Sequence, residues 1–163
     1  MNKKYAVFAI IILTLSAVLV TFYMNQTDQN SINERTKELV EDAVRLIEEK
    51  GEAAFPELRN EGTKWFNNDT YVFVWRTDGI RVVYPPDLNG EGQNMSILID
   101  ATGKEIGRLF IEIALNEEGE GWIDYKWPKP GEAEPSSKKT FIKLASYAEN
   151  SFLVGSGFYL DTN

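Results

Sequence analysis

A run of 20 residues without charge near the N-terminus is the feature that most constrains this chain. The run extends from Tyr5 to Met24 and contains no Asp, Glu, Lys or Arg. As an α-helix it would be roughly 30 Å long, which is the thickness of the hydrocarbon core of a bilayer. It is apolar on all sides, whereas a surface helix of a globular protein has one apolar stripe. We therefore expect residues 5–24 to form a transmembrane helix that acts as a signal anchor.

The charges beside this run predict its orientation. Lys3 and Lys4 precede it, and residues 25–30 contain no positive charge. By the positive-inside rule, residues 1–4 would lie in the cytoplasm and residues 25–163 outside the cell membrane. A cleaved signal peptide and a buried soluble helix are the alternatives. The run ends in Phe-Tyr-Met, where a signal peptidase site needs small residues, so we prefer a retained anchor.

The composition excludes several classes of chemistry. The chain has no cysteine and no histidine, so it has no disulfides, no thiolate nucleophile, no Ser–His pair and few good zinc ligands. All 25 acidic residues follow the apolar run, and the net charge of −8 repels nucleic acid. A calcium loop starting at Asp87 would need Glu at its twelfth position, which is Leu98. We expect a binding domain rather than an enzyme, without metal or cofactor.

The segment after the apolar run has the period of an amphipathic helix. Apolar residues recur at spacings of three, four and seven between Ile32 and Ile47. Ser31 or Asn33 is a suitable N-cap, and the alternative is a helix that continues directly from the apolar run. Gly51 is a suitable end, because glycine readily adopts the left-handed conformation of a C-terminal cap.

Beyond residue 70 the apolar period changes from 3.6 to 2, which is typical of strands. An Asp-Gly pair at residues 78–79 predicts a tight hairpin. The predicted elements are a short helix around residues 53–55, strands at 71–75 and 80–84, a helix at 105–116, and strands at 122–127, 139–145 and 152–160. This order predicts an α+β fold, in which an antiparallel sheet of about five strands packs on the long N-terminal helix.

Short segments in this order resemble the single Cache (sCache) family of extracytoplasmic sensor domains. The matching segments include Gly51–Phe55, Tyr71–Val74, Asp78-Gly79, Tyr84-Pro85, Gly92–Asn94, Asp100–Gly103, Gly121–Pro128, Lys138, Phe141–Lys143 and Val154–Asp161. The resemblance implies a PAS-like sheet with a pocket on the face away from the N-terminal helix. Small molecules, often carboxylates or amino acids, bind there in that family.

The resemblance also sets an expectation for signalling. Family members usually lie between two membrane helices and drive a kinase, chemoreceptor or cyclase module. This sequence stops three residues after Leu160, so we expect a membrane-anchored sensor domain that has no output domain of its own and acts through a homodimer or a membrane signalling partner. The alternatives are a pocketless dimerisation or interaction module, and a hydrolase that pairs Asp124 with Glu112.

Aromatic residues are the main candidates for the walls of the pocket. Tyr71, Phe73 and Trp75 alternate along one strand and share its face, as Tyr125 and Trp127 do along another. The opposite face of the first strand is aliphatic and suits packing against the helix. We expect these five residues to bind the ligand, and the alternative is that they are ordinary core aromatics.

Polar candidates follow from the resemblance. Lys138 aligns with the family's pocket-edge lysine, and we expect it at the start of a strand, after a flexible loop. It is our first choice for the residue that binds a carboxylate; the alternative is a solvated loop lysine. Lys143 is a weaker candidate. Tyr84 stands where many family members have His, and retains a hydrogen-bond donor without titrating near neutral pH. Asp161 would bind an amino group or cap the last strand, and Arg76 is expected at the surface.

Overall fold

The computed structural model describes the backbone of residues 3–160 and the side chains of residues 19–24 and 26–160. Residues 1–35 form one compact unit and residues 36–163 another. The side chains of residues 5–18, which make up most of the predicted membrane span at residues 5–24, are outside the described part of the chain. Within the described residues, none of the helices combines the length and the apolar character that crossing a membrane requires.

Helix α1 spans Lys3–Lys50 without a break. Neither Ser31 nor Asn33 is therefore an N-cap, and the alternative of one continuous helix is confirmed. The helix ends at Gly51, as predicted, and this glycine has a φ of +60°. A short 3-10 helix, η1 (Gly51–Ala54), and helix α2 (Phe55–Leu58) follow, with Pro56 in the first turn of α2.

The sheet has six antiparallel strands rather than about five. They are β1 (Phe66–Asn67), β2 (Thr70–Arg76), β3 (Arg81–Val83), β4 (Glu120–Pro128), β5 (Pro135–Tyr147) and β6 (Asn150–Tyr159). The order is β1-β2-β6-β5-β4, and β3 also pairs with β2. The unexpected strand is β1, two residues long, which pairs with β2 across a turn where Asn68 has a φ of 52°.

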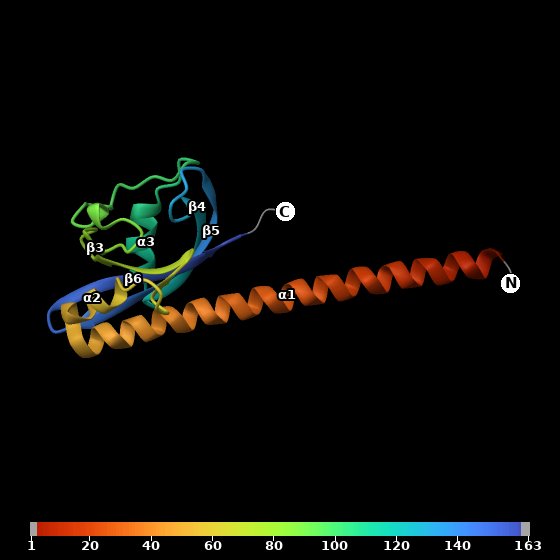
Figure 1. The fold of residues 1–163 in the computed structure, drawn as a ribbon, viewed down its shortest axis with the longest axis horizontal. Coiled ribbons are helices and arrows are strands. Elements are labelled where there is room, and N and C mark those ends of the chain that lie inside the picture. Colours follow the sequence, from red (N-terminus) through yellow and green to blue (C-terminus); the bar gives the residue numbers. More distant parts are fainter. Residues whose placement is uncertain (1–2, 161–163) are drawn as a thin grey trace. The chain divides into compact units, whose positions relative to one another are not determined.

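The two faces of the sheet carry different layers. Figure 1 shows α2 and the end of α1 on one side of the sheet, and α3 (Ile106–Ala114) with the loop before it on the other. Alternation divides the strand residues between the two layers. On the helix side, Val72 and Val74 of β2 join Val40, Val44 and Ile47 of α1 in one apolar cluster. The face away from α1 is left for the second cluster, which contains the predicted aromatic residues.

An irregularity in the hairpin of β2 and β3 changes this alternation. Val74 pairs with Val83, but Trp75 pairs with Arg81, so Val82 is an extra residue in β3. Such a bulge moves the residues beyond it to the other face of the sheet. Arg81 consequently joins Trp75 on the face away from α1.

A long loop from residue 84 to residue 105 covers this face, and it includes the 3-10 helix η2 (Leu88–Gly90). Asp100 holds the loop in place. Its carboxylate accepts hydrogen bonds from the backbone N–H of Lys126 at 2.8 Å, from Thr102 N and Oγ1 at 2.8 and 2.6 Å, and from Lys104 N at 3.0 Å. Burial opposes the ionised form, but these hydrogen bonds outweigh it and hold the pKa of Asp100 well below its usual range.

Candidate functional site: an aromatic pocket

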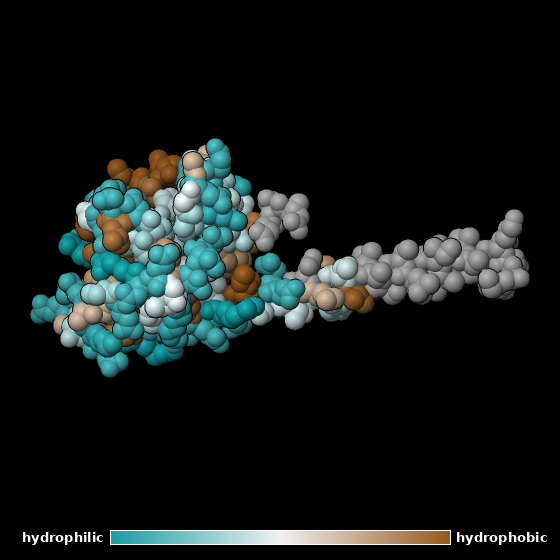
Figure 2. Space-filling view, viewed as in Figure 1, coloured by the Kyte–Doolittle hydropathy of each residue, from teal (hydrophilic) through white to brown (hydrophobic). Residues whose placement is uncertain are grey.

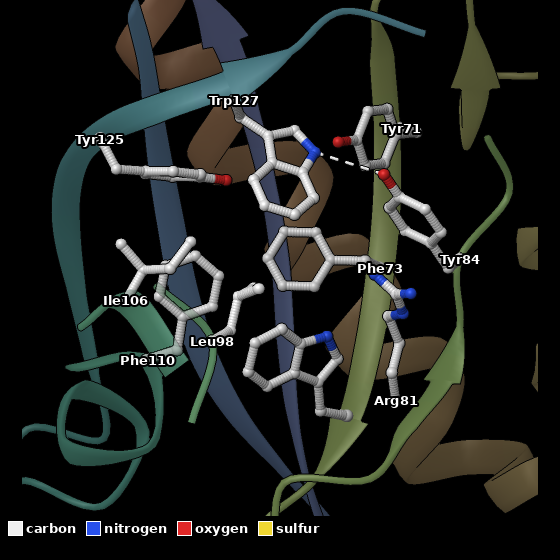
Figure 3. Close-up of a pocket in the computed structure, with 10 residues that line it drawn as sticks. Tyr71, Phe73, Arg81, Tyr84, Leu98, Ile106, Phe110, Tyr125 and Trp127 are labelled. Atoms are coloured by element: carbon white, nitrogen blue, oxygen red, sulfur yellow. Dashed lines mark hydrogen bonds between the residues drawn. The ribbon is translucent and has the colours of Figure 1, made fainter. Parts of the chain in front are cut away.

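Side chains from two strands form one wall of a pocket on the sheet face away from α1. Tyr71 and Phe73 project from β2, and Tyr125 and Trp127 project from β4 (Figure 3). Trp75 of β2 also lines the pocket. All five line the pocket, and four of them also belong to a buried core cluster, so their role as ligand-binding residues stays a prediction. Their position follows from strand alternation, because the residues between them point to the helix side.

The opposite wall comes from α3 and the loop that precedes it. Ile106 and Phe110 contribute from α3, and Leu98 contributes from the loop. Phe110 stacks on Phe73, with ring centroids 5.7 Å apart and an interplanar angle of 20°. Helix α3 therefore closes the aromatic cluster from the side that the sheet leaves open.

One hydrogen bond joins the two aromatic side chains that remain partly exposed. The indole Nε1 of Trp127 donates to the hydroxyl of Tyr84 at 3.2 Å (Figure 3). Tyr84 in turn packs edge-on against Tyr71, with ring centroids 5.7 Å apart. The aromatic side chains fill most of the pocket, and about 20 Å³ remains for the centre of a water molecule. That space holds about one water.

Lys138 is buried more deeply than the sequence indicated. It does not begin its strand after a flexible loop: β5 begins at Pro135, and Lys138 pairs with Tyr125 on β4 and Tyr159 on β6. The strand begins earlier because β5 pairs with the whole length of β4, which extends the pairing back to Pro135. The side chain of Lys138 has no exposed surface. Both the expected position and the alternative of a solvated loop lysine are therefore wrong.

The ammonium group of Lys138 has aromatic neighbours. Its Nζ lies 3.9 Å from the ring centroid of Tyr71 and 4.6 Å from that of Tyr159, whose hydroxyl it approaches at 3.4 Å. Among the described residues, no carboxylate is within ion-pair distance of it. A buried cation without an anionic partner is costly, so this group needs an explanation.

Burial changes the protonation of this cluster. It lowers the pKa of Lys138 to about 7, an effect that the charge of Asp69 only partly opposes. Burial also raises the pKa values of Tyr71, Tyr125 and Tyr159 above the usual range. Near neutral pH the lysine therefore titrates, while the tyrosines keep their protons and remain hydrogen-bond donors.

Arg81 is a pocket residue that the sequence analysis missed. It is 6% exposed and lines the pocket. Its Nε donates to the carbonyl oxygen of Gly90 at 2.9 Å, and its guanidinium carbon lies 4.0 Å from the ring centroid of Tyr84. Simple alternation from Tyr84 gave no reason to place Arg81 in the pocket, because the extra residue in β3 is not visible in the pattern. Tyr159 was also missed as a site residue, although the Gly-x-Gly-x-Tyr motif at the chain end contains it.

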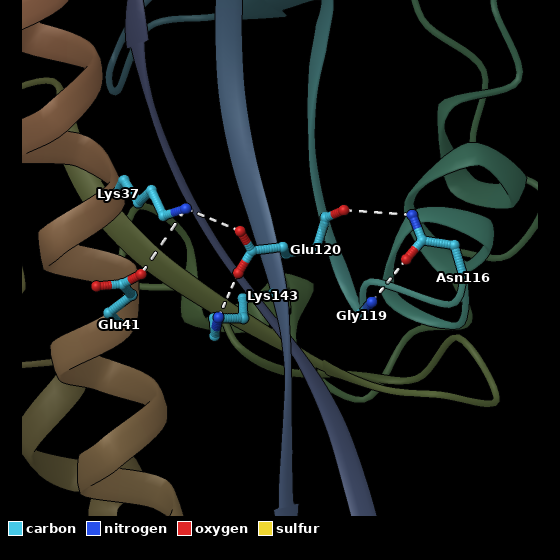
Figure 4. Close-up of polar contacts among 6 residues, drawn as sticks. All are labelled: Lys37, Glu41, Asn116, Gly119, Glu120 and Lys143. Atoms are coloured by element: carbon cyan, nitrogen blue, oxygen red, sulfur yellow. Dashed lines mark hydrogen bonds and ion pairs between the residues drawn. The ribbon is translucent and has the colours of Figure 1, made fainter.

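The other polar candidates lie elsewhere. Arg76 is exposed and pairs with Asp78, so its surface position is confirmed. Lys143 pairs with Glu120, which also accepts from Lys37 of α1 at 2.8 Å (Figure 4). Lys143 is not among the residues that line the pocket. Asp161 lies outside the described residues.

Nothing in the described part of the chain suggests a metal site. Among those residues, no three Asp or Glu side chains come together as a cation site would require. Of the pair considered for hydrolysis, Glu112 forms an ion pair with Arg108, and Asp124 is exposed on β4. Neither carboxylate lines the pocket.

An α+β domain with an antiparallel sheet, a long N-terminal helix and an aromatic pocket on the opposite face is the architecture of extracytoplasmic sensor domains. Comparison with known proteins agrees with this class. The sequence model of the Cache domain matches residues 14–163. The chain therefore belongs to the Cache domain family.

Two curated relatives are signalling proteins. The methyl-accepting chemotaxis protein McpP of Pseudomonas putida is 26% identical over 96 residues, which are 59% of this chain and 17% of that protein. The sensor histidine kinase MctS of Rhizobium johnstonii is 35% identical over 97 residues, again 59% of this chain and 20% of that protein. The chain thus matches only about a fifth of the length of either relative.

Two solved structures have the same fold. A periplasmic sensor domain of a chemotaxis protein superposes with a TM-score of 0.70 and 27% identity, covering 82% of this chain and 97% of that one. A Cache chemosensory domain studied for carboxylic acid recognition superposes with a TM-score of 0.66 and 21% identity, covering 83% and 98%. The fold prediction is confirmed in its α+β class, its long helix and its PAS-like sheet.

Proposed function

We propose that this chain is a sensor domain whose aromatic pocket binds a small carboxylate or amino acid. Lys138, which contacts the ring of Tyr71 but is not among the residues that line the pocket, would supply the charge that the carboxylate needs once the pocket opens. Tyr71, Tyr84, Tyr125 and Trp127 would supply donors and walls. The observation that carries this proposal is the fully buried Lys138, which has no carboxylate within ion-pair distance among the described residues. A bound carboxylate would compensate this charge in a site of low dielectric constant, where such a pair is strong when well hydrogen-bonded.

The comparisons support the class of ligand without identifying it. One of the similar structures belongs to a Cache chemosensory domain that recognises carboxylic acids. At 21% identity that likeness concerns the fold, so the argument for this chain depends on its own lysine and tyrosines.

Binding requires the pocket to open. The free space admits about one water, which is less than any carboxylate occupies. Trp127 and Tyr84 are the side chains suited to move, because they are partly exposed and a single hydrogen bond joins them. When a ligand binds, this hydrogen bond would break, and Trp127 Nε1 and the Tyr84 hydroxyl would donate to the carboxylate of the ligand instead.

The location of the domain is part of the proposal. We propose that residues 5–24 anchor the chain in the cell membrane, with residues 1–4 in the cytoplasm and the sensor domain outside. The charge-free run and Lys3 and Lys4 before it support this orientation. A signal would then reach a membrane partner or a second copy of the chain through α1.

One observation favours the alternative of a pocketless interaction module. Phe73, Trp75 and Trp127 occupy much of the space where a ligand would lie, and the remaining volume is small. In that case the aromatic cluster is only a core, and the domain acts by dimerisation or by docking on a membrane partner.

A binding experiment separates the two. We expect small carboxylates and amino acids, screened against the purified full chain in mild detergent, to raise its unfolding temperature. A hundredfold excess of ligand over Kd corresponds to about 2.7 kcal/mol of stabilisation. Replacement of Lys138 by Met should abolish the shift, whereas Lys143→Met, on the opposite face of the same strand, should keep it.

Two outcomes would contradict the proposal. If no compound shifts the unfolding temperature, the interaction module is the better description. If Lys138→Met retains a shift of the wild-type size, Lys138 is not the carboxylate partner.

A further inference from the structure

Two donors at the β3 end of the pocket have no role in the carboxylate site proposed above. Trp75 and Arg81 are register partners on β2 and β3, so their side chains leave neighbouring backbone positions on the same face of the sheet. Both line the pocket, and they are 2% and 6% exposed. The bulge in β3 brings them together.

The indole of Trp75 is an unsatisfied donor. Its Nε1 is buried and has no hydrogen-bond partner within the described part of the chain. Buried tryptophan N–H groups usually have one, because an unpaired buried donor costs about 1–3 kcal/mol. An acceptor in the pocket would satisfy it.

Arg81 is a second cation without a counterion in the pocket. Two carboxylates, Asp87 and Glu91, act on Arg81 electrostatically without forming an ion pair with it. Asp87 accepts from Asn89 N, and Glu91 accepts from Arg59 Nε and Nη2 and from the backbone N–H of Tyr84 at 2.7 Å. Among the described residues no ion pair of Arg81 exists. Nε bonds to Gly90 O, which leaves the outer N–H groups of the guanidinium for another acceptor.

Tyrosine rings connect the two cations. The guanidinium of Arg81 lies on the ring of Tyr84, Tyr84 packs on Tyr71, and the ammonium group of Lys138 contacts the ring of Tyr71. Arg81 lines the pocket, whereas Lys138 is separated from it by the ring of Tyr71, which does line it. A ligand that displaces this ring would therefore meet a buried positive group on each side of the tyrosines. A ligand of matching charge carries two anionic groups separated by a short carbon chain.

We propose that Arg81 and Trp75 form a second anion-binding subsite, and that the ligand of this pocket is a small dicarboxylate. This inference rests on the proposed function, because Lys138 must bind the first carboxylate. The second carboxylate accepts hydrogen bonds from the guanidinium fork of Arg81 and from Trp75 Nε1, while Phe73 and its aromatic neighbours hold the carbon chain. A guanidinium suits this role, since it can bind a carboxylate through two parallel hydrogen bonds.

Calorimetry with matched pairs of acids tests this inference on the full chain. Propanedioate is compared with propanoate and butanedioate with butanoate, at pH 7, where both carboxylates of each diacid are ionised. We expect the wild type to bind a diacid about tenfold or more tightly than its monoacid, since hydrogen bonds to charged groups contribute about 1.5–3 kcal/mol. Arg81→Met should remove this preference, so that a diacid binds no more tightly than its monoacid, and Trp75→Phe should reduce it.

Two further variants guard against misfolding and nonspecific charge effects. In Gly90→Ala, the new Cβ would fall on Arg81 Nη2, so the guanidinium is displaced while its charge remains. This variant should weaken diacid binding as Arg81→Met does. Arg76→Met removes an exposed arginine at the end of β2 and should have no effect.

The possible failures are distinguishable. Monoacid binding without any diacid preference, or a preference that survives both Arg81→Met and Gly90→Ala, overturns the second subsite and leaves the proposed function intact. If neither series of acids binds the wild type, the proposed function and the second subsite both fall.

Discussion

Lys138 is the residue whose chemistry depends most on its surroundings. In the sequence it is one of two adjacent lysines before a strand. In the fold it lies on a central strand between β4 and β6, and its ammonium group contacts two tyrosine rings. The structure has thus removed it from water, and the cost of its charge appears as a pKa near 7.

The pH dependence of stability follows from this pKa. In the unfolded chain the lysine has its ordinary pKa of 10.5, and in the folded domain about 7. Between these values the unfolded state binds a proton that the folded state lacks, so the free energy of unfolding rises with pH. Without ligand, we expect it to rise between pH 7.5 and 9 by roughly 1 kcal/mol per unit in urea denaturation. Well below pH 7 both states are protonated, and the dependence disappears.

A single substitution isolates this contribution. Lys138→Met should have a flat profile over the same range, because the chain has no histidine or cysteine that would titrate there. A rise of equal slope in Lys138→Met would show that another group is responsible. A flat wild-type profile would show that the buried amine has an ordinary pKa.

At the scale of elements, the loop between β3 and α3 determines how the pocket is closed. Residues 84–105 carry Tyr84 and Leu98 over the pocket. Figure 2 shows an apolar patch at the top of the domain, where this loop lies in Figure 1. Leu88, Ile97 and Ile99 are the exposed apolar residues of this loop. Hydrogen bonds to Asp100, rather than apolar packing alone, tie it to the sheet through Lys126.

Replacement of Asp100 tests this attachment. Asp100→Ala removes the acceptor of four hydrogen bonds and leaves N–H groups of Thr102, Lys104 and Lys126 without it. We expect a loss of stability of roughly 3 kcal/mol, measured by urea denaturation, because each buried donor left unpaired costs about 1–3 kcal/mol. The exposed Asp124 on β4 is the control, and Asp124→Ala should change stability by about 0.5 kcal/mol or less. Equal effects of the two variants would contradict the assigned role of Asp100.

At the scale of the whole molecule, two faces of one sheet have separate tasks. The face toward α1 forms a mixed aliphatic and aromatic core, which includes Phe141 and Phe152 of the sheet, while the other face carries the aromatic pocket. Glu120 links the helix and the sheet, since it binds Lys37 on α1 and Lys143 on β5 (Figure 4). These two lysines lower the pKa of Glu120, Lys143 most, so the link stays charged in mildly acidic solution.

The predicted anchor is also a property of the whole chain. In bacterial cells, we expect the chain to sediment with membranes and to resist extraction at alkaline pH, with the domain accessible to protease added to spheroplasts. Inserting two aspartates within residues 5–24 should release the chain from the membrane, since each charge near the bilayer centre costs about 2.5–3.5 kcal/mol. Shortening of the wild-type chain after export would indicate the cleaved signal peptide instead.

The sequence by itself determined the α+β class, the order of most elements and which side chains of the first strand share the aromatic face. It could do so because strand alternation is local: once Tyr71, Phe73 and Trp75 share a face and the valines between them suit a helix, the aromatic side follows. The end of α1 at Gly51 and the turn at Asp78-Gly79 were predicted for the same reason, since backbone preference is a property of the residues themselves.

The tertiary structure decided which polar residues are buried and which face of the sheet they occupy, because these properties do not follow from local sequence. Pairing with β4 and β6 buried Lys138 inside a strand, although its neighbourhood in the sequence is a polar loop. One extra residue in β3 turned Arg81 toward Trp75, and no pattern of period two contains that change of register. Burial and register depend on segments far apart in the chain, so the two cations of the pocket became visible only once the sheet was assembled.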